Sequence, residues 1–197
     1  MRSQPCQSNA WNNDTCLWTP QRCWWRETNQ HWNFNSMNAT VSTGQISEYL
    51  SRHLGDVFEM MLSMKAVSAP ANEAHHLHGE RVTGTVGLAG DAVTGSVYLH
   101  ISSAFSLQAT AAMLGLPAEE ITGTTEINDV VGEVTNMLAG GLKSWLCDSG
   151  ASCALTTPAV IRGTSFEINP KPGVQIILIG FDCGENKGLV EVHVKFN

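Results

Sequence analysis

The stretch of residues 126–146 carries apolar side chains at the spacing of an amphipathic α-helix. At about 100° per residue, these apolar side chains share one broad face that would lie on a core: Ile127, Val130, Val131, Val134, Leu138, Leu142 and Trp145. Four other residues fall within a stripe roughly 60° wide on the opposite face: Asp129, Glu133, Asn136 and Gly140. The pattern therefore predicts a polar side on which a carboxylate and a carboxamide can act together.

Two glycines lie inside this predicted helix, where each costs about 1 kcal/mol relative to alanine. They are Gly140, which shares the polar stripe, and Gly141. A polar stripe on a helix is most often a solvated face. The glycines favour the other interpretation, in which something packs close to the helix backbone.

The spacing Asp129-x-x-x-Glu133-x-x-Asn136, followed later by Pro158, resembles the signature of the CheC/CheX/FliY family. The flanking sequence Gly-Glu-Val-Thr-Asn-Met-Leu-Ala-Gly-Gly, with Pro-Ala-Val-Ile-Arg-Gly after it, is most similar to the CheX branch. The resemblance covers roughly residues 44 to 197. Members of this family are bacterial phosphatases that act on the phosphorylated response regulator CheY. The resemblance therefore implies a cytoplasmic chemotaxis phosphatase that forms a homodimer.

The resemblance also implies a role for each motif residue. The catalytic pair would be Asn136, whose neutral carboxamide holds the attacking water, and Glu133, which pairs with the lysine of the receiver domain. Asp129 would support the approach of the receiver. Gly140 would let the receiver backbone come close, and Pro158 would shape the loop behind the helix.

We expect no cofactor on this chain, because catalysis of phosphoryl transfer is mostly positioning and charge neutralisation. The Mg²⁺ is expected on the partner receiver domain. His75, His76 and His78 lack the i, i+4 spacing of a helical metal site, and no carboxylate is patterned with them. The sequence therefore predicts no metal site.

Two other functions are compatible with the sequence. The first is a non-catalytic adaptor whose same helix binds a receiver domain or a flagellar switch component without hydrolysing anything. The second is a phosphatase that serves a signalling system outside chemotaxis. The presence of Asn136 favours an enzyme over the adaptor.

The order of predicted elements favours an α+β domain built from two divergent helix-plus-hairpin halves, with a largely antiparallel sheet and long helices packed on it, as in CheC. Laying the first helix on the motif helix places Glu59 opposite Glu133 and Leu62 opposite Asn136, so the first half lacks the amide. The predicted helices span residues 45–64, 103–115 and 125–146. The predicted strands span 81–89, 93–101, 159–161, 174–181 and 189–196, with residues 184–188 joining the last two.

Composition separates residues 1–36 from the rest, since they hold five of the six tryptophans and three of the six cysteines. They show no helical or strand period and no secretory signal. We interpret them as a disordered arm, a cysteine-containing metal or redox segment, or a misassigned start upstream of Met37, and expect the phosphatase domain to span residues 37–197.

The net charge and the cysteine spacing limit which partners and which cellular compartment fit this protein. The net charge of −7 disfavours nucleic acid and anionic membrane as partners, and no apolar run is long enough to cross a bilayer. Cysteines without metal spacing indicate reduced thiols in a cytosol.

Overall fold

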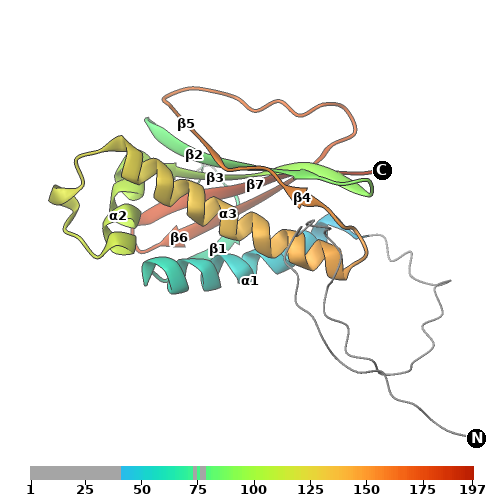
Figure 1. Ribbon diagram of the computed structural model, residues 1–197, viewed down its shortest axis with the longest axis horizontal. Helices are drawn as coiled ribbons and strands as arrows, with labels where there is room; N and C mark the ends of the chain where they lie inside the picture. Colours follow the sequence, from blue (N-terminus) through green and yellow to red (C-terminus); the bar gives the residue numbers. More distant parts are fainter. Residues whose placement is uncertain (1–40, 73–74, 76–78) are drawn as a thin grey trace, which may run out of the picture. The chain divides into compact units, whose positions relative to one another are not determined.

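Seven strands form one sheet, and three helices cover one of its faces in the part of the chain that the computed structural model describes, residues 41–72, 75 and 79–197 (Figure 1). Residues 1–36, the expected extension, lie outside the described residues. No described helix combines the length and the apolar composition needed to cross a membrane. The elements are α1 (Thr43–Leu62), β1 (Val67–Pro70), β2 (Arg81–Ala89), β3 (Val93–Ser102), α2 (Ser103–Leu114), η2 (Ala118–Glu120), α3 (Thr124–Asp148), β4 (Ala154–Leu155), β5 (Ala159–Gly163), β6 (Gln175–Cys183) and β7 (Asn186–Phe196).

The strands are arranged nearly symmetrically about the centre of the sheet. Strands β7 and β3 pair at the centre, and each is flanked by its own hairpin partner, β6 or β2. Beyond these, β1 from the first half pairs with β6, and β5 from the second half pairs with β2. All pairings are antiparallel. The predicted α+β class with two helix-plus-hairpin halves is confirmed, and each half completes the sheet of the other.

Several predicted boundaries were wrong. The five-residue connection at 184–188 is a two-residue turn, because Cys183 pairs with Asn186 and Gly184 has a φ of 62°. Gly188 lies within β7, where its missing side chain leaves room for the ring of Phe181. The sequence predicts Ser103 as the N-cap of the second helix, whereas the N-cap of α2 is Ser102, whose hydroxyl accepts from the Phe105 amide at 3.1 Å. The short elements β1, β4 and η2 were not predicted.

The predicted equivalence of Glu59 with Glu133 was also wrong. Glu59 lies three residues before the end of α1, whereas Glu133 lies in the first half of α3. Matching the helices by their core faces puts Tyr49 at the position of Glu133 and Arg52 at that of Asn136. The first half still lacks the amide. The matched core residues are Ile46, Leu50, Leu54, Phe58 and Leu62 of α1, and Val130, Val134, Leu138, Leu142 and Leu146 of α3.

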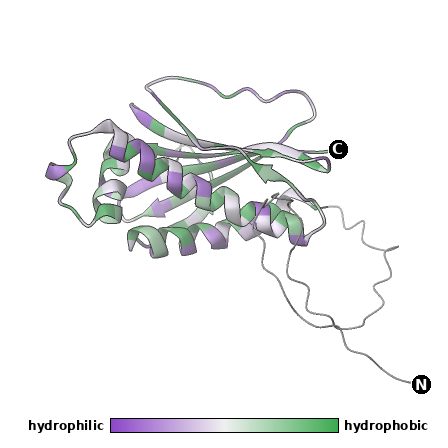
Figure 2. Ribbon diagram, viewed as in Figure 1, coloured by the Kyte–Doolittle hydropathy of each residue, from purple (hydrophilic) through white to green (hydrophobic). Residues whose placement is uncertain are grey.

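Helix α3 lies directly on β2 at Gly84. A Cβ atom at Gly84 would stand 2.0 Å from Oγ1 of Thr135, which is far inside van der Waals contact. Thr135 is fully buried, and its hydroxyl donates to the Val131 carbonyl at 2.6 Å. The close approach turns the core side of α3 to the sheet and leaves its polar stripe outward. Hydrophilic and hydrophobic residues accordingly alternate along α3 in Figure 2.

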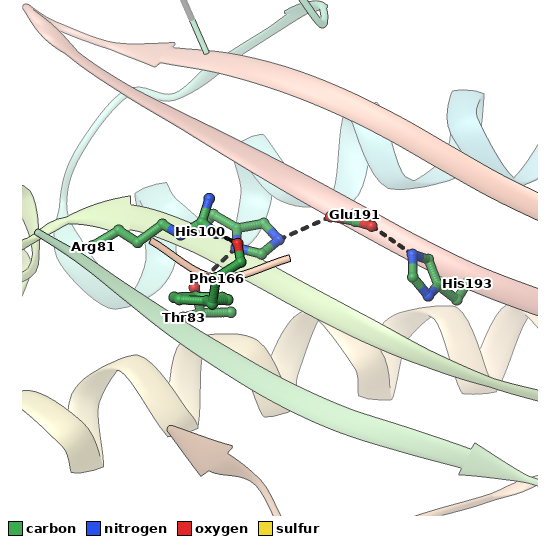
Figure 3. Close-up of polar contacts among 6 residues, drawn as sticks. All are labelled: Arg81, Thr83, His100, Phe166, Glu191 and His193. Atoms are coloured by element: carbon green, nitrogen blue, oxygen red, sulfur yellow. Dashed lines mark hydrogen bonds and ion pairs between the residues drawn. The ribbon is translucent and has the colours of Figure 1, made fainter. Parts of the chain in front are cut away.

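The opposite face of the sheet, called here the helix-free face, carries a buried polar cluster (Figure 3). Glu191 lies between two imidazoles: Nε2 of His100 donates to Oε2 at 3.1 Å, and Nε2 of His193 donates to Oε1. Nδ1 of His100 lies 2.9 Å from the hydroxyl of Thr83. Burial alone would raise the pKa of Glu191, but the hydrogen bonds and charges of the two histidines outweigh it and hold the pKa below its ordinary value.

This cluster predicts an acid-dependent loss of stability. Because the folded pKa of Glu191 lies below the unfolded value of about 4.3, its contribution is complete above that value and is lost as pH falls through the folded pKa. The free energy of unfolding in urea should therefore fall more steeply below about pH 5 in the wild type than in Glu191→Gln. Glu185→Gln, at an exposed glutamate in the adjoining turn, should follow the wild type. Parallel curves for the wild type and Glu191→Gln would contradict the assignment.

Candidate functional site

The polar stripe of α3 lies where the sequence predicts it. Asp129 and Glu133 are exposed, while Asn136 and Gly140 are half-buried. All four lie opposite the core-facing residues of the helix. The prediction of one helix face carrying these residues is confirmed; the roles assigned to them stay predictions.

A shallow groove of about 450 Å³ runs along one side of this stripe. It brings together three of the predicted site residues, Asp129, Glu133 and Pro158. Asn136 and Gly140 do not line the groove; they follow it along the same face of α3. The lining residues are Asn128, Asp129, Gly132, Glu133, Pro158 and Val160.

Pro158 was expected behind the motif helix, and that expectation was wrong. Strand β5 pairs with β2 so that Val160 lies opposite Gly84, directly beside α3. Pro158 immediately precedes β5 and is exposed at the mouth of the groove. A Cβ atom placed on Gly132 would lie 3.7 Å from Pro158 Cβ and 3.9 Å from Val160 Cγ2. Pro158 therefore forms the wall that faces Glu133.

Four residues at this site were not predicted from the sequence. Asn128, Gly132 and Val160 line the groove, and Nε of Arg162 donates to Oδ1 of Asn128 at 2.9 Å. Asn128 and Gly132 are four residues apart and so share one edge of the helix. That spacing was the available signal, but the strand that covers this edge comes from a distant segment that helical periodicity does not locate.

The two helix glycines have different surroundings. A Cβ at Gly141 would stand 2.0 Å from Nε2 of His53, which donates to the Met137 carbonyl at 3.2 Å. The His53 ring stacks on Tyr49, which stacks in turn on Trp145, each at 5.5 Å between ring centres. The close neighbour of Gly141 is therefore α1 of the same chain. A Cβ at Gly140 would meet nothing within 4 Å, so its side of the helix is open.

The charge of the groove suits a cationic group. Its charged lining residues are the two carboxylates, Asp129 and Glu133. Within the described residues, no group of three or more histidine, cysteine, aspartate or glutamate side chains is placed to hold a metal ion. His75 is buried, with Nδ1 2.9 Å from Oδ1 of Asn72, and His76 and His78 lie outside the described residues.

Comparison with known families matches residues 82–182 to the family described as chemotaxis phosphatase CheX. This segment includes α3 with its polar stripe and the groove wall from Pro158 to Val160. No curated protein matches the chain in sequence.

Solved structures show the same architecture. The chemotaxis protein CheX from Vibrio vulnificus has 25% identity and a TM-score of 0.66, over 79% of this chain and 100% of that one. A CheC-like superfamily protein from Shewanella sp. PV-4 has 28% identity and a TM-score of 0.65, over 76% and 97%. The CheX–CheY–BeF3–Mg²⁺ complex from Borrelia burgdorferi matches with 20% identity and a TM-score of 0.62, over 75% and 96%, which shows the fold alone.

The fold and the stripe on α3 define a CheC-like α+β protein with an exposed polar stripe on its long helix. The chain belongs to the CheX family of chemotaxis phosphatases. It is accordingly a phosphatase.

The two glycines give a matched pair of stability predictions. Gly140→Ala should raise the free energy of unfolding by up to about 1 kcal/mol, because alanine is the better helix former and the space is open. Gly141→Ala should lower it by about 1 to 2 kcal/mol, because His53 must leave its stack and its hydrogen bond. Urea unfolding of both variants measures the difference. A Gly141→Ala protein as stable as Gly140→Ala would show that His53 does not require this glycine.

Proposed function

We propose that this protein hydrolyses the aspartyl-phosphate of a CheY-like receiver domain in chemotaxis signalling. The observation that carries the proposal is the juxtaposition on α3 of an acidic groove and, immediately beyond it, the half-buried Asn136. The CheX structure from Borrelia burgdorferi, which contains CheY with BeF3 and Mg²⁺, supports a receiver as the partner.

Asn136 is the residue proposed to act on the reacting atoms. A water attacks the phosphorus in line, the bond between phosphorus and the aspartate oxygen breaks, and inorganic phosphate and a free carboxylate result. The carboxamide oxygen of Asn136 accepts a hydrogen bond from this water, while its NH₂ group donates to a neighbouring oxygen. Because the amide is neutral, the negatively charged phosphoryl group does not repel it. The Mg²⁺ belongs to the receiver.

Glu133 and its neighbours are proposed to dock the receiver. Glu133 is exposed at the groove, where its carboxylate can pair with the receiver lysine and fix the register of the complex. Asp129 adds a second carboxylate to the same groove, and Pro158 forms its opposite wall. Gly140 leaves open space next to Asn136 along the helix, into which the receiver backbone fits.

The cytoplasm is the proposed location, because receiver domains and their aspartyl-phosphates are made there. The thiols fit a reducing compartment. Cys147, Cys153 and Cys183 are free, and burial raises the pKa of the Cys153 and Cys183 thiols, which keeps them protonated and unreactive.

The motif residues are separable by kinetics. Glu133→Ala should chiefly raise the receiver concentration for half-maximal rate, because its charge pair exists before and during the reaction. Asn136→Ala should chiefly lower the maximal rate, by about 100-fold or more, because water placement matters only in the transition state. Asn136→Asp should be nearly as poor, since it lacks the NH₂ donor and adds a negative charge.

The measurement is the decay rate of a phosphorylated CheY receiver against its concentration. Glu59→Ala, at an exposed glutamate of α1, is the matched control and should behave as the wild type. An Asn136→Ala protein that keeps its maximal rate would rule out the mechanism. A wild-type protein that binds the receiver without speeding its decay would establish the adaptor function instead.

A homodimer is also proposed, with the helix-free face as its interface. Ile161, Ile176 and Leu178 lie on that face and are 41–48% exposed, and a second copy would remove this apolar surface from water. Ile176→Asp should therefore give a monomer in sedimentation, while Met60→Asp, at a 66% exposed position on α1, should not. A wild-type protein that sediments as a monomer at micromolar concentration would contradict the dimer.

A further inference from the structure

The outer wall of the groove is a short edge strand. Strand β5 has five residues and forms a ladder with β2 alone. An edge element with a single ladder opens at low free energy unless other contacts hold it. Val160 of β5 and Pro158, which immediately precedes the strand, line the groove together with the carboxylates of α3. The width of the groove therefore depends on what fastens β5 to α3.

Arg162 provides that connection. It lies opposite Val82 in the β5–β2 register, on the helix-covered face, so its side chain enters the space between β5 and α3. Its Nε donates to Oδ1 of Asn128 at 2.9 Å, a hydrogen bond between residues 34 positions apart. Asn128 itself lines the groove and immediately precedes Asp129. The Nη2 atom of Arg162 is buried with no hydrogen-bond partner among the described residues.

We propose that Arg162 is a positioning residue for the receiver: by holding Asn128, it fixes the Pro158–Val160 wall at the distance from Asp129 and Glu133 that the docked receiver requires. The inference rests on the proposed function. Arg162 contacts Asn128 but does not itself line the groove. Its loss should therefore weaken docking and leave the chemical step intact, which appears as a higher KM with an unchanged kcat.

A matched control separates positioning from mere stability. Arg81 is an arginine on β2 that lies opposite Gly163 of β5, on the helix-free face. Its guanidinium covers the Phe166 ring, 3.8 Å from the ring centre, and donates to the Phe166 carbonyl. Arg81→Met removes a comparable arginine from the same strand pair without reaching the groove.

The experiment compares Arg162→Met, Asn128→Ala, their double variant, Asn128→Asp and Arg81→Met with the wild type. We expect each of the first two to raise KM for the phosphorylated receiver about tenfold, with kcat within about twofold of the wild type. The double variant should be no worse than either single variant, because both remove one interaction. Asn128→Asp should keep KM at or below the wild-type value, since a carboxylate can accept from both Nε and the buried Nη2. Arg81→Met should lower the melting temperature without raising KM.

Binding of a CheY receiver loaded with beryllofluoride and Mg²⁺, measured by calorimetry, gives a readout that does not require turnover. The inference is overturned if Arg162→Met binds this receiver as tightly as the wild type, or if Arg81→Met loses as much affinity. It is also overturned if the effects of Arg162→Met and Asn128→Ala add. A wild type that binds the loaded receiver but hydrolyses nothing refutes the proposed function and leaves the positioning role standing.

Discussion

The contact between Thr135 and Gly84 is the constraint on which the site depends. With no Cβ atom on Gly84, Thr135 lies on the backbone of β2, and α3 is seated at a fixed depth on the sheet. In this position Val131 and the neighbouring core residues of α3 face the sheet, and Glu133 faces solvent. It also brings α3 beside β5, which pairs with β2, so that Pro158 lies close to Gly132. A bulkier residue at Gly84 would move the helix and open both contacts.

The duplicated architecture explains why only one half carries the proposed chemistry. The sheet is nearly symmetric about its central β7–β3 pair, and α1 and α3 present the same spacing of core residues. At the positions of Glu133 and Asn136, however, α1 has Tyr49, which stacks on Trp145, and Arg52, which pairs with Glu48 at 3.5 Å. The first half therefore supports α3: the stack of Tyr49 on Trp145 and the contact of His53 with Gly141 hold α3 on the side opposite β5.

Periodicity predicted the elements well and their contacts poorly. The apolar spacing of residues 126–146 gave α3 within a few residues, and alternation gave both hairpins, because both patterns are local consequences of one buried face. The groove was not predictable in this way. It depends on β5 crossing from the second half to pair with β2, and on Arg162 meeting Asn128 across 34 residues. The sequence also did not show what packs against Gly141, and the structure identifies it as His53 of α1.

The separation of Asn136 from the groove suits the two tasks proposed for this face. A docking contact benefits from carboxylates, because a charged pair with a cation is directional and strong. A residue beside a phosphoryl group benefits from neutrality, because an anion there would oppose the attacking water and the departing charge. Placing Asp129 and Glu133 in the groove, and Asn136 about one helical turn further on, keeps the negative charge of the protein away from the reacting phosphorus. The stripe thereby keeps the two carboxylates, which would repel a phosphoryl group, apart from the neutral amide proposed to lie beside it.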